Sequence, residues 1–443
     1  MLIPFGLIPT HTWVDQRPNV LLIFADDLGY GDLSMTGHPV INTPNIDGLA
    51  RNGVFATDFY VNPACTASRY ALLTGKYSAR SGFDWVLGPD SPRYLHPGEN
   101  TLAEALKTGG YRTGMFGKWH LGFPNEKNKF SIESLPLKHG FDRFVGIPYS
   151  NDMQPPKYPD LPLFEGPSRQ GDYFQDYHLI AMNPDLTKIG KVLTDSAIDF
   201  MSQKSSAPFF CYFPIPMPHT PLNPDSDHAG KSARGAYGDV VEEIDSHVGR
   251  LLAFLKKTGK EKNTLVVFLS DNGPWILQGL SGGSSGLFRD GKGSTWEGGV
   301  RVPAIFSWPG KLPKGVRYQS PLAHIDVAPT ICDAAGVSFS GSHDGESILS
   351  EMKSGMPVPE RNILLFGAGQ KLFAVRRGDW KFHIDTYSQV KKYDGELPLL
   401  FNVKVDPSES QSVTKTNTEL TAQLLDILKT SDQNIKREGS LWK

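Results

Sequence analysis

The chain has 443 residues, with 45 basic and 47 acidic side chains and a formal net charge of −2. A single hydrophobic core stops growing at about 250 to 300 residues, so two packed parts are expected. No run of basic residues is present that would follow a phosphate backbone, which argues against nucleic acid as a partner. No segment is apolar over the length needed to span a bilayer.

The cysteines and the N-terminal stretch bear on the compartment. Cys65, Cys211 and Cys332 are an odd number, so at least one of them is free or modified and a disulfide framework is excluded. The opening MLIPFGLIPTHTW lacks the basic region and the uninterrupted apolar run of a signal peptide. Either the native leader is absent from this sequence or the protein is not exported.

In chain order, short apolar runs rich in β-branched and aromatic residues predict buried strands at 19–24, 111–116, 208–213, 264–269 and 303–308. Amphipathic patterns between them predict helices at 43–52, 101–108 and 237–258. Strands that alternate with helices favour an α/β fold with a large, mostly parallel central sheet covered on both faces.

The pattern changes after about Gly336. Residues 373–384 read as two strands around a turn, residues 398–405 as another strand, and residues 418–428 as an amphipathic helix. We therefore expect a smaller C-terminal antiparallel sheet with a helix, and a division of the chain into 1–336 and 337–443.

Acidic residues follow two of the predicted strands. Asp26 and Asp27 come after the first strand, and Asp271 and Asn272 follow the strand at 264–269. Each pair alone is more often a polar turn or helix cap. Because ligands bind beyond the carboxyl ends of parallel strands, the two pairs together suggest an oxygen-lined site for Ca²⁺ or Mg²⁺ rather than Zn²⁺.

Cys65 stands in a loop entry and is followed by Thr66, Ala67 and Ser68, which are small enough to permit close approach. A lone cysteine is most often a small buried hydrophobe. If the chain is helical from Ser68 onward, Arg69 can reach back to the same place.

Four further cationic or titratable residues are candidates for the same site. Lys118 and His120 have i, i+2 spacing, which would place both on one face of an extended segment. His219 lies between prolines that stiffen its loop, and Lys292 lies between glycines that permit close approach. Solvated lysines and loop histidines without function are common, so each residue counts for little alone.

The order of these groups, with the text around them, resembles the type I, formylglycine-dependent sulfatases, closest to the arylsulfatase A and N-acetylgalactosamine-6-sulfatase group. The matching text includes FADDLGYGDL, CTASRYALLTGK, GYRTGMFGKWHLG, SDNGP and GKGSTWEGGVRVP. The resemblance implies an alkaline phosphatase-like fold for the large sheet, a sulfatase catalytic domain at 1–336 and a C-terminal α+β subdomain at 337–443.

The resemblance also implies the cofactors. Cys65 would be oxidised to formylglycine by a maturation enzyme, and its hydrate would be the nucleophile. The ion would be Ca²⁺, with Cys65 near it and four ligands from the acidic turns: Asp26, Asp27, Asp271 and Asn272.

Roles for the remaining residues follow from the same resemblance. Three cations would neutralise the sulfate, namely Arg69, Lys118 and Lys292. His120 would hold or deprotonate the hydrate, and His219 would protonate the departing alcohol. The expected substrate contacts are Ser150, Lys118, His219 and Lys292.

Two positions depart from the family pattern, since Ala67 stands where Pro is usual and Lys76 where Arg is usual. Ala67 raises the question of which enzyme modifies Cys65.

The expected substrate is a sulfated carbohydrate or an aryl sulfate, in the periplasm or outside the cell, with a cytoplasmic location left open. Two alternatives stand beside this hypothesis: a phosphate or phosphonate monoester hydrolase of the same superfamily, and a sugar-binding protein whose Cys65 is never oxidised. The loops 155–171 and 275–290, which would decide the sugar, contain no readable pattern, and the oligomeric state is open.

Overall fold

The structure is a computed structural model that describes residues 17–123, 132–168 and 176–442. The N-terminal stretch discussed above lies outside the described residues, and so do residues 169–171 of the loop 155–171.

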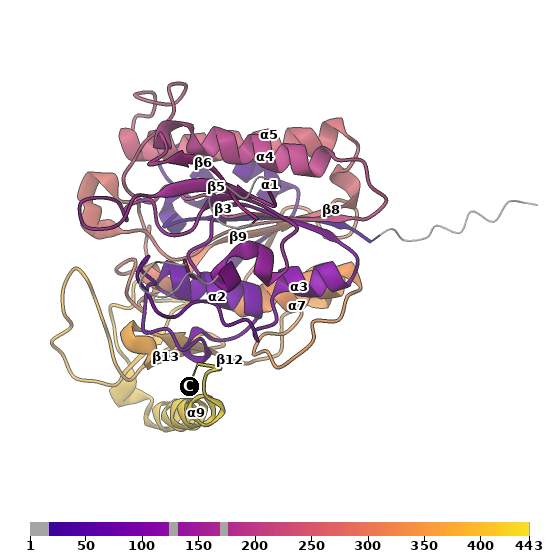
Figure 1. Ribbon diagram of the computed structural model, residues 1–443. Helices are drawn as coiled ribbons and strands as arrows, with labels where there is room; N and C mark the ends of the chain where they lie inside the picture. The colour runs from indigo at the N-terminus through magenta and orange to yellow at the C-terminus, as the bar shows by residue number, and fades with distance from the viewer. Residues whose placement is uncertain (1–16, 124–131, 169–175, 443) are drawn as a thin grey trace, which may run out of the picture.

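An 11-stranded sheet runs through the centre of the molecule (Figure 1). Its order is β10-β2-β9-β8-β1-β7-β3-β4-β5-β6, with β11 beside β2. The strands β8, β1, β7, β3 and β4 are parallel neighbours, whereas β9 and β5 run antiparallel to the strands beside them. The bounds are β1 (Asn19–Ala25), β2 (Val54–Tyr60), β3 (Arg112–Lys118), β4 (Arg143–Ile147), β5 (Pro162–Gly166), β6 (His178–Met182), β7 (Phe209–Phe213), β8 (Thr264–Ser270), β9 (Arg301–Ser307), β10 (Val316–Tyr318) and β11 (Leu322–Ala323).

Two cores sandwich this sheet, and the alternation of side chains along β1 explains them. Val20, Leu22 and Phe24 belong to one core, while Leu21 and Ile23 belong to the other. Helices α2, α3 and α7 cover the first face, and α1, α4 and α5 cover the second (Figure 1). The helices are α1 (Pro44–Arg51), α2 (Cys65–Thr74), α3 (Leu102–Thr108), α4 (Ile189–Ser202), α5 (Ala236–Lys257), α6 (Glu297–Val300), α7 (Val327–Ala335) and α8 (Leu349–Ser354).

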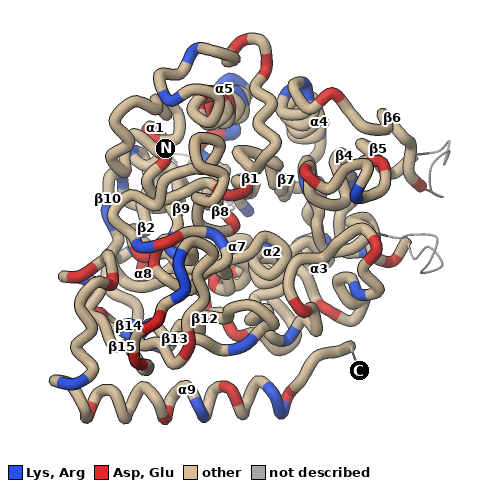
Figure 2. Tube along the Cα trace, turned by 90° about the vertical axis from the view of Figure 1, so that its left-hand side faces the viewer, with Lys and Arg blue, Asp and Glu red and all other residues tan. Residues whose placement is uncertain are grey.

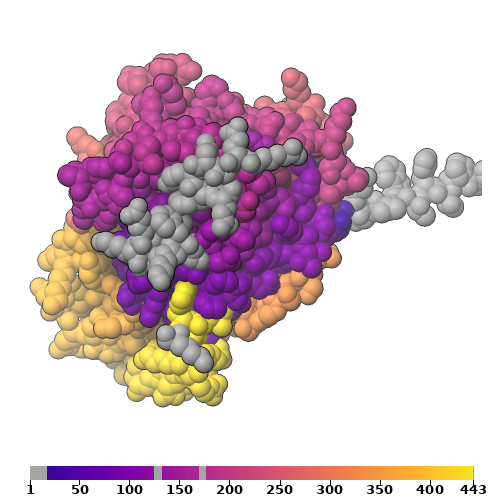
Figure 3. All heavy atoms as spheres, viewed as in Figure 1, coloured from indigo at the N-terminus to yellow at the C-terminus, as the bar shows by residue number. Residues whose placement is uncertain are grey.

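A second, wholly antiparallel sheet has the order β12-β13-β14-β15. Its strands are β12 (Asn362–Phe366), β13 (Leu372–Arg377), β14 (Trp380–His383) and β15 (Leu399–Asn402). Leu424 and Leu428 of helix α9 (Thr418–Glu438) lie in its core. We call β12 to β15 and α9 the C-terminal unit, which forms the golden and yellow part at the lower left and bottom of the molecule in Figure 3.

Buried ion pairs join the C-terminal unit to the rest of the chain. The Nζ of Lys381, in β14, lies 2.9 Å from Oε1 of Glu297 and 3.1 Å from Oε1 of Glu409, and all three side chains are fully shielded from solvent. His383 contacts the same Glu409 oxygen at 2.8 Å. The division of the chain at residue 336 stays a prediction.

The predicted α/β architecture is confirmed, including the smaller antiparallel sheet with its helix. Strand β2 was not predicted, because Thr57 and Asp58 interrupt its apolar pattern; Asp58 is buried through an ion pair with Arg301 at 2.9 Å. Acidic and basic residues are interspersed along α9 and elsewhere (Figure 2). Among the helices of the described residues, none is both long and apolar enough to cross a membrane.

Candidate active site

The acidic turns meet because β1 and β8 are adjacent parallel strands. Ala25 pairs with Ser270, so the residues that follow each strand lie side by side. The backbone N–H of Asp27 donates to Oδ1 of Asp271 at 3.0 Å, and Nδ2 of Asn272 donates to Oδ1 of Asp27 at 2.7 Å. Asp27 has a φ of 67°, in the left-handed region, so the chain turns sharply here.

The donor set of this cluster fits a hard cation. Oδ1 of Asp26 and Oδ1 of Asn272 are buried and have no hydrogen-bond partner among the described residues. Buried polar atoms are normally satisfied, so two unpaired oxygens at one edge of the sheet are what a Ca²⁺ or Mg²⁺ site requires.

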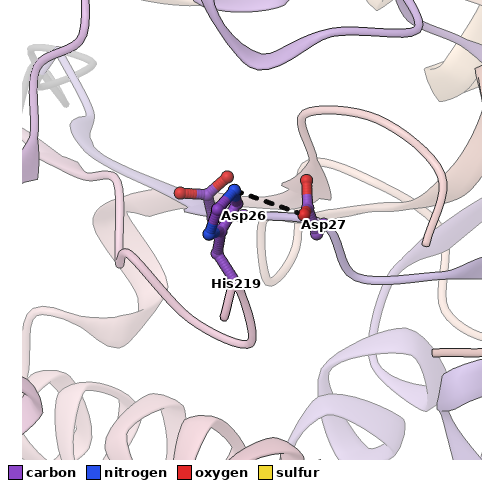
Figure 4. Close-up of side chains that lie close together, drawn as sticks. All are labelled: Asp26, Asp27 and His219. Atoms are coloured by element: carbon purple, nitrogen blue, oxygen red, sulfur yellow. Dashed lines mark ion pairs between the residues drawn. The ribbon is translucent and has the colours of Figure 1, made fainter. Parts of the chain in front are cut away.

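His219 belongs to the same cluster. One ligand atom each from Asp26, Asp27 and His219 lie within 4.8 Å of one another (Figure 4). The Nε2 of His219 is 3.5 Å from Oδ2 of Asp27, and its Nδ1 is 2.6 Å from the carbonyl oxygen of Thr220. Hard cations prefer oxygen, so the two carboxylates suit such an ion better than the imidazole nitrogen does. Burial first, and then the charge of Lys292, lower the pKa of His219.

Lys118 stands at the end of β3, within reach of β1. Its Nζ lies 2.6 Å from Oδ2 of Asp26 and 3.0 Å from Oγ of Ser150, and Lys118 and Asp26 are fully shielded. Burial alone would raise the pKa of Asp26, but the cations of Lys118 and Arg69 lower it well below its usual range. Asp26 is therefore a carboxylate at neutral pH.

Arg69 connects the acidic residues to β3. One guanidinium nitrogen lies 2.9 Å from Oδ2 of Asp271 and 3.5 Å from Oδ2 of Asp26, while the other donates to the carbonyl oxygen of Lys118 at 2.9 Å. Burial opposes its charge, but the two carboxylates raise its pKa. Arg69 therefore holds the turns after β1 and β8 together.

Cys65 is the first residue of α2, so the chain is helical from Ser68 onward, the condition under which Arg69 can reach back toward Cys65. The thiol is 2 % exposed, and burial raises its pKa to about 11 although Lys118 and Lys292 are close enough to oppose this shift. An unmodified Cys65 is therefore a protonated thiol and a weak nucleophile at neutral pH.

The backbone at His120 differs from the prediction. Its φ is 57°, so the extended backbone of β3 ends before it, and the i, i+2 argument does not describe the side chain. Its Nε2 lies 2.9 Å from the carbonyl oxygen of Leu87, while its Nδ1 is buried without a hydrogen-bond partner among the described residues. Burial, Lys118 and Arg69 lower its pKa well below the usual range. The neutral ring donates through Nε2 and keeps a lone pair on Nδ1.

Lys292 approaches the cluster from the segment before α6. Its Nζ lies 2.8 Å from the Asp27 carboxylate, and its backbone N–H donates to the carbonyl oxygen of Pro274 at 2.9 Å. A Cβ atom on Gly291 would lie 2.4 Å from that same carbonyl oxygen, so glycine permits the close approach that the sequence predicted.

Two contacts at the site were not predicted. The Leu87 carbonyl oxygen pairs with His120 through the backbone, so it leaves no signal in the sequence. Trp275 contacts both His219 and Lys292, and the available signal was its position directly after the SDNGP motif.

The sequence matches two family patterns. Sulfatase matches residues 18–337, and N-sulphoglucosamine sulphohydrolase, C-terminal, matches residues 283–434. The chain is 38 % identical to arylsulfatase A of Bos taurus over 93 % of this chain and 86 % of that protein. It is 34 % identical to N-acetylgalactosamine-6-sulfatase of Canis lupus familiaris over 91 % and 83 %.

A solved sulfatase structure also resembles this fold over nearly the whole chain. The crystal structure of PsFucS1 sulfatase from Pseudoalteromonas sp. superposes with a TM-score of 0.84 at 27 % identity, over 95 % of this chain and 91 % of that one. With the pattern match over residues 18–337 and the two named relatives, the chain belongs to the sulfatase family and is a sulfuric ester hydrolase.

Proposed function

We propose that this protein hydrolyses the sulfate monoester of a sugar, with a formylglycine made from Cys65 and a Ca²⁺ ion held by Asp26, Asp27, Asp271 and Asn272. The observation that carries the proposal is the pair of buried, unpartnered oxygens of Asp26 and Asn272, beside Cys65 and set among the buried cations Arg69 and Lys118 and the partly exposed Lys292. The name of the N-acetylgalactosamine-6-sulfatase relative supports a sugar as the sulfated alcohol.

When bound, the ion would supply Lewis acidity and lower the pKa of a coordinated hydroxyl. A sulfate monoester carries negative charge that spreads over its nonbridging oxygens as the S–O bond breaks. Lys118, Lys292 and Arg69 supply fixed positive charge for these oxygens, with Ser150 as a hydrogen-bond donor beside Lys118. Preorganised donors of this kind are worth about 10² to 10³ in rate each.

The two histidines have separate tasks in this proposal. His120 is neutral, and its free Nδ1 lone pair suits it to accept a proton from a hydroxyl of residue 65. His219 gives a proton from Nε2 to the departing alcohol oxygen when its ring is protonated, because Nδ1 already faces the Thr220 carbonyl oxygen. Attack of one hydroxyl on sulfur breaks the bond to the alcohol, and loss of a proton from the second hydroxyl then expels sulfate and restores the aldehyde.

Phosphate ester hydrolysis is the alternative activity that must be distinguished from sulfate ester hydrolysis. A two-zinc phosphatase needs additional His and Asp ligands around Asp271. In the described part of the chain, the groups of at least three His, Cys, Asp or Glu residues that are close enough for a metal are Asp26, Asp27 and His219, and Asp225, His228 and Glu243. Neither group includes Asp271.

The test begins with peptide mass spectrometry of Cys65. Protein shown to carry the aldehyde is then assayed on defined sulfated mono- and disaccharides, nitrophenyl sulfate and nitrophenyl phosphate. Turnover of sulfate esters in preference to the phosphate supports the proposal. Converted, Ca²⁺-loaded protein that prefers the phosphate, or hydrolyses neither class, would overturn it.

The maturation enzyme and the compartment belong to the proposal as well. Formylglycine requires a partner that oxidises Cys65, and action on sulfated polysaccharide fragments fits the periplasm or the outside of the cell.

A further inference from the structure

The proposed sulfate site is closed on most sides. Asp26, Arg69 and Lys118 are fully shielded, and His219 is 4 % exposed. The Lys292 side chain keeps 11 % of its surface exposed, and Trp275 beside it is only half-buried. A substrate whose sulfate lies among the buried cations therefore directs its alcohol past Lys292 and Trp275.

Trp275 lies next to the bond that would break. Its ring centroid is 5.5 Å from that of His219, and the Nζ of Lys292 lies 4.7 Å from the indole centroid. In the proposed function Lys292 contacts the sulfate and His219 protonates the leaving oxygen. The indole is thus beside the first atoms of the departing alcohol.

The C-terminal unit holds Trp275 in place. The indole N–H donates to Oε1 of Gln389 at 3.1 Å, and Gln389 belongs to the segment between β14 and β15. Nε2 of Gln389 packs against Gly293, and a Cβ atom built on Gly293 would lie 2.4 Å from that nitrogen. Because the indole nitrogen only donates, the carboxamide must present its oxygen to it, and its NH₂ group remains on the other side as a donor.

We propose that Trp275 and Gln389 form the leaving-group subsite and select a pyranose ring, which makes the C-terminal unit part of the substrate site. The indole offers an apolar surface to the C–H groups of the ring, and the Gln389 NH₂ group offers hydrogen bonds to its hydroxyls. A planar aryl alcohol would use the indole alone. This inference rests on the proposed function for the position of the sulfate.

Binding tests the subsite separately from turnover. In full-length Cys65→Ala protein with Ca²⁺, calorimetry gives Kd for galactose 6-sulfate, glucosamine 6-sulfate and inorganic sulfate. The ratio of the sugar sulfate Kd to the sulfate Kd reports the subsite, because inorganic sulfate has no alcohol portion. Gln389→Ala and Trp275→Ala are expected to weaken the sugar preference about tenfold, the scale of one or two lost contacts. Val390→Ala, in the same segment and 57 % exposed, is the matched control and should leave the ratio unchanged.

A Trp275→Phe variant and the turnover of converted protein help to interpret these binding ratios. Trp275→Phe keeps the ring but not the bond to Gln389, so it should lie between the parent and Trp275→Ala. If both alanine variants weaken sulfate and sugar sulfates equally, or if the parent prefers no sugar sulfate over sulfate, the subsite is refuted. If the sugar preference depends on Trp275 and Gln389 but converted protein hydrolyses no sulfate ester, the subsite stands and the proposed function fails.

Discussion

The Nζ of Lys381 lies 2.9 Å from Oε1 of Glu297, and neither side chain has any exposed surface. The pair joins β14 of the C-terminal unit to α6, which follows the segment that carries Lys292. Burial alone would raise the pKa of Glu297, but Lys381 and Arg301 lower it to about 2, so the acid is charged.

Lys381→Met should therefore destabilise the protein by about 3 to 5 kcal/mol, because it removes the buried cation that Glu297 and Glu409 share. Lys404→Met, which removes an exposed lysine paired with Asp379, should cost less than about 1 kcal/mol. Urea unfolding measures both. Equal effects of the two substitutions would contradict the ion-pair argument.

Removal of the metal should lower the melting temperature and abolish sulfatase activity, and added Ca²⁺ should restore both. A ligand present at 100 times its Kd stabilises the folded state by about 2.7 kcal/mol. Asn272→Ala removes one of the unpartnered oxygens, so it should reduce the Ca²⁺-dependent gain measured by differential scanning fluorimetry. Asn263→Ala, away from the acidic turns, is the control; a metal response that Asn272→Ala leaves intact would argue against this ligand set.

His219→Ala should slow different substrates to different extents. A sugar alkoxide is a poor leaving group that needs a proton, so kcat/KM for the sugar sulfate should fall about 10² to 10⁴-fold. Nitrophenolate leaves without a proton, so the fall for nitrophenyl sulfate should be much smaller. A His228→Ala variant, in which the imidazole paired with Asp225 is lost, should leave both rates unchanged. Equal losses on the two substrates would exclude His219 as the proton donor.

Cys65→Ser should trap a sulfated protein. Serine supplies one hydroxyl in place of the two hydroxyls of the aldehyde hydrate, so it can accept the sulfuryl group but cannot expel it. Intact-protein mass spectrometry after incubation with nitrophenyl sulfate should show one added sulfuryl group, and Cys65→Ala should show none. Absence of the adduct from the folded serine variant would count against residue 65 as the nucleophile.

Stability should fall in acid partly through His324. Burial lowers its pKa to about 3, and its Nε2 lies 3.0 Å from Nδ2 of Asn62. The unfolded chain binds a proton near pH 6.5, whereas the folded chain stays neutral until about pH 3, so this contribution is complete above pH 6.5 and is lost as the pH falls. At pH 5 the loss amounts to about 2 kcal/mol.

His324→Gln should remove this part of the pH dependence, so that unfolding free energies measured in urea at pH 7 and pH 5 differ by about 2 kcal/mol less than in the parent. His228→Gln, on a partly exposed residue, provides the comparison. An unchanged slope in His324→Gln would show that the ring is not kept neutral by burial.

The sequence predicted those parts of the site that depend on strand order. Asp26 and Asp271 follow apolar strands that turn out to be parallel neighbours, so their meeting needed only the rule about strand ends. The start of α2 could not be predicted, because Ala64 precedes it and offers no side-chain cap. Likewise the turn at His120 depends on one left-handed residue, which no periodicity reveals.

Contacts between loops that are distant in the chain also could not be predicted from the sequence. Trp275 and Gln389 are 114 residues apart, and neither loop has an apolar period that fixes its path. Their meeting depends on how the C-terminal unit packs against the large sheet, which tertiary contacts such as the Lys381 pairs decide.

The burial of the cysteines has a consequence for the order of folding and the proposed oxidation of Cys65. Cys65, Cys211 and Cys332 are each no more than 2 % exposed and lie in α2, β7 and α7. Under the proposed function, the enzyme that oxidises Cys65 would need access to a thiol that the folded chain buries at the start of α2. Oxidation would then have to precede the packing of α2, and a chain that folds first would keep an unreacted thiol.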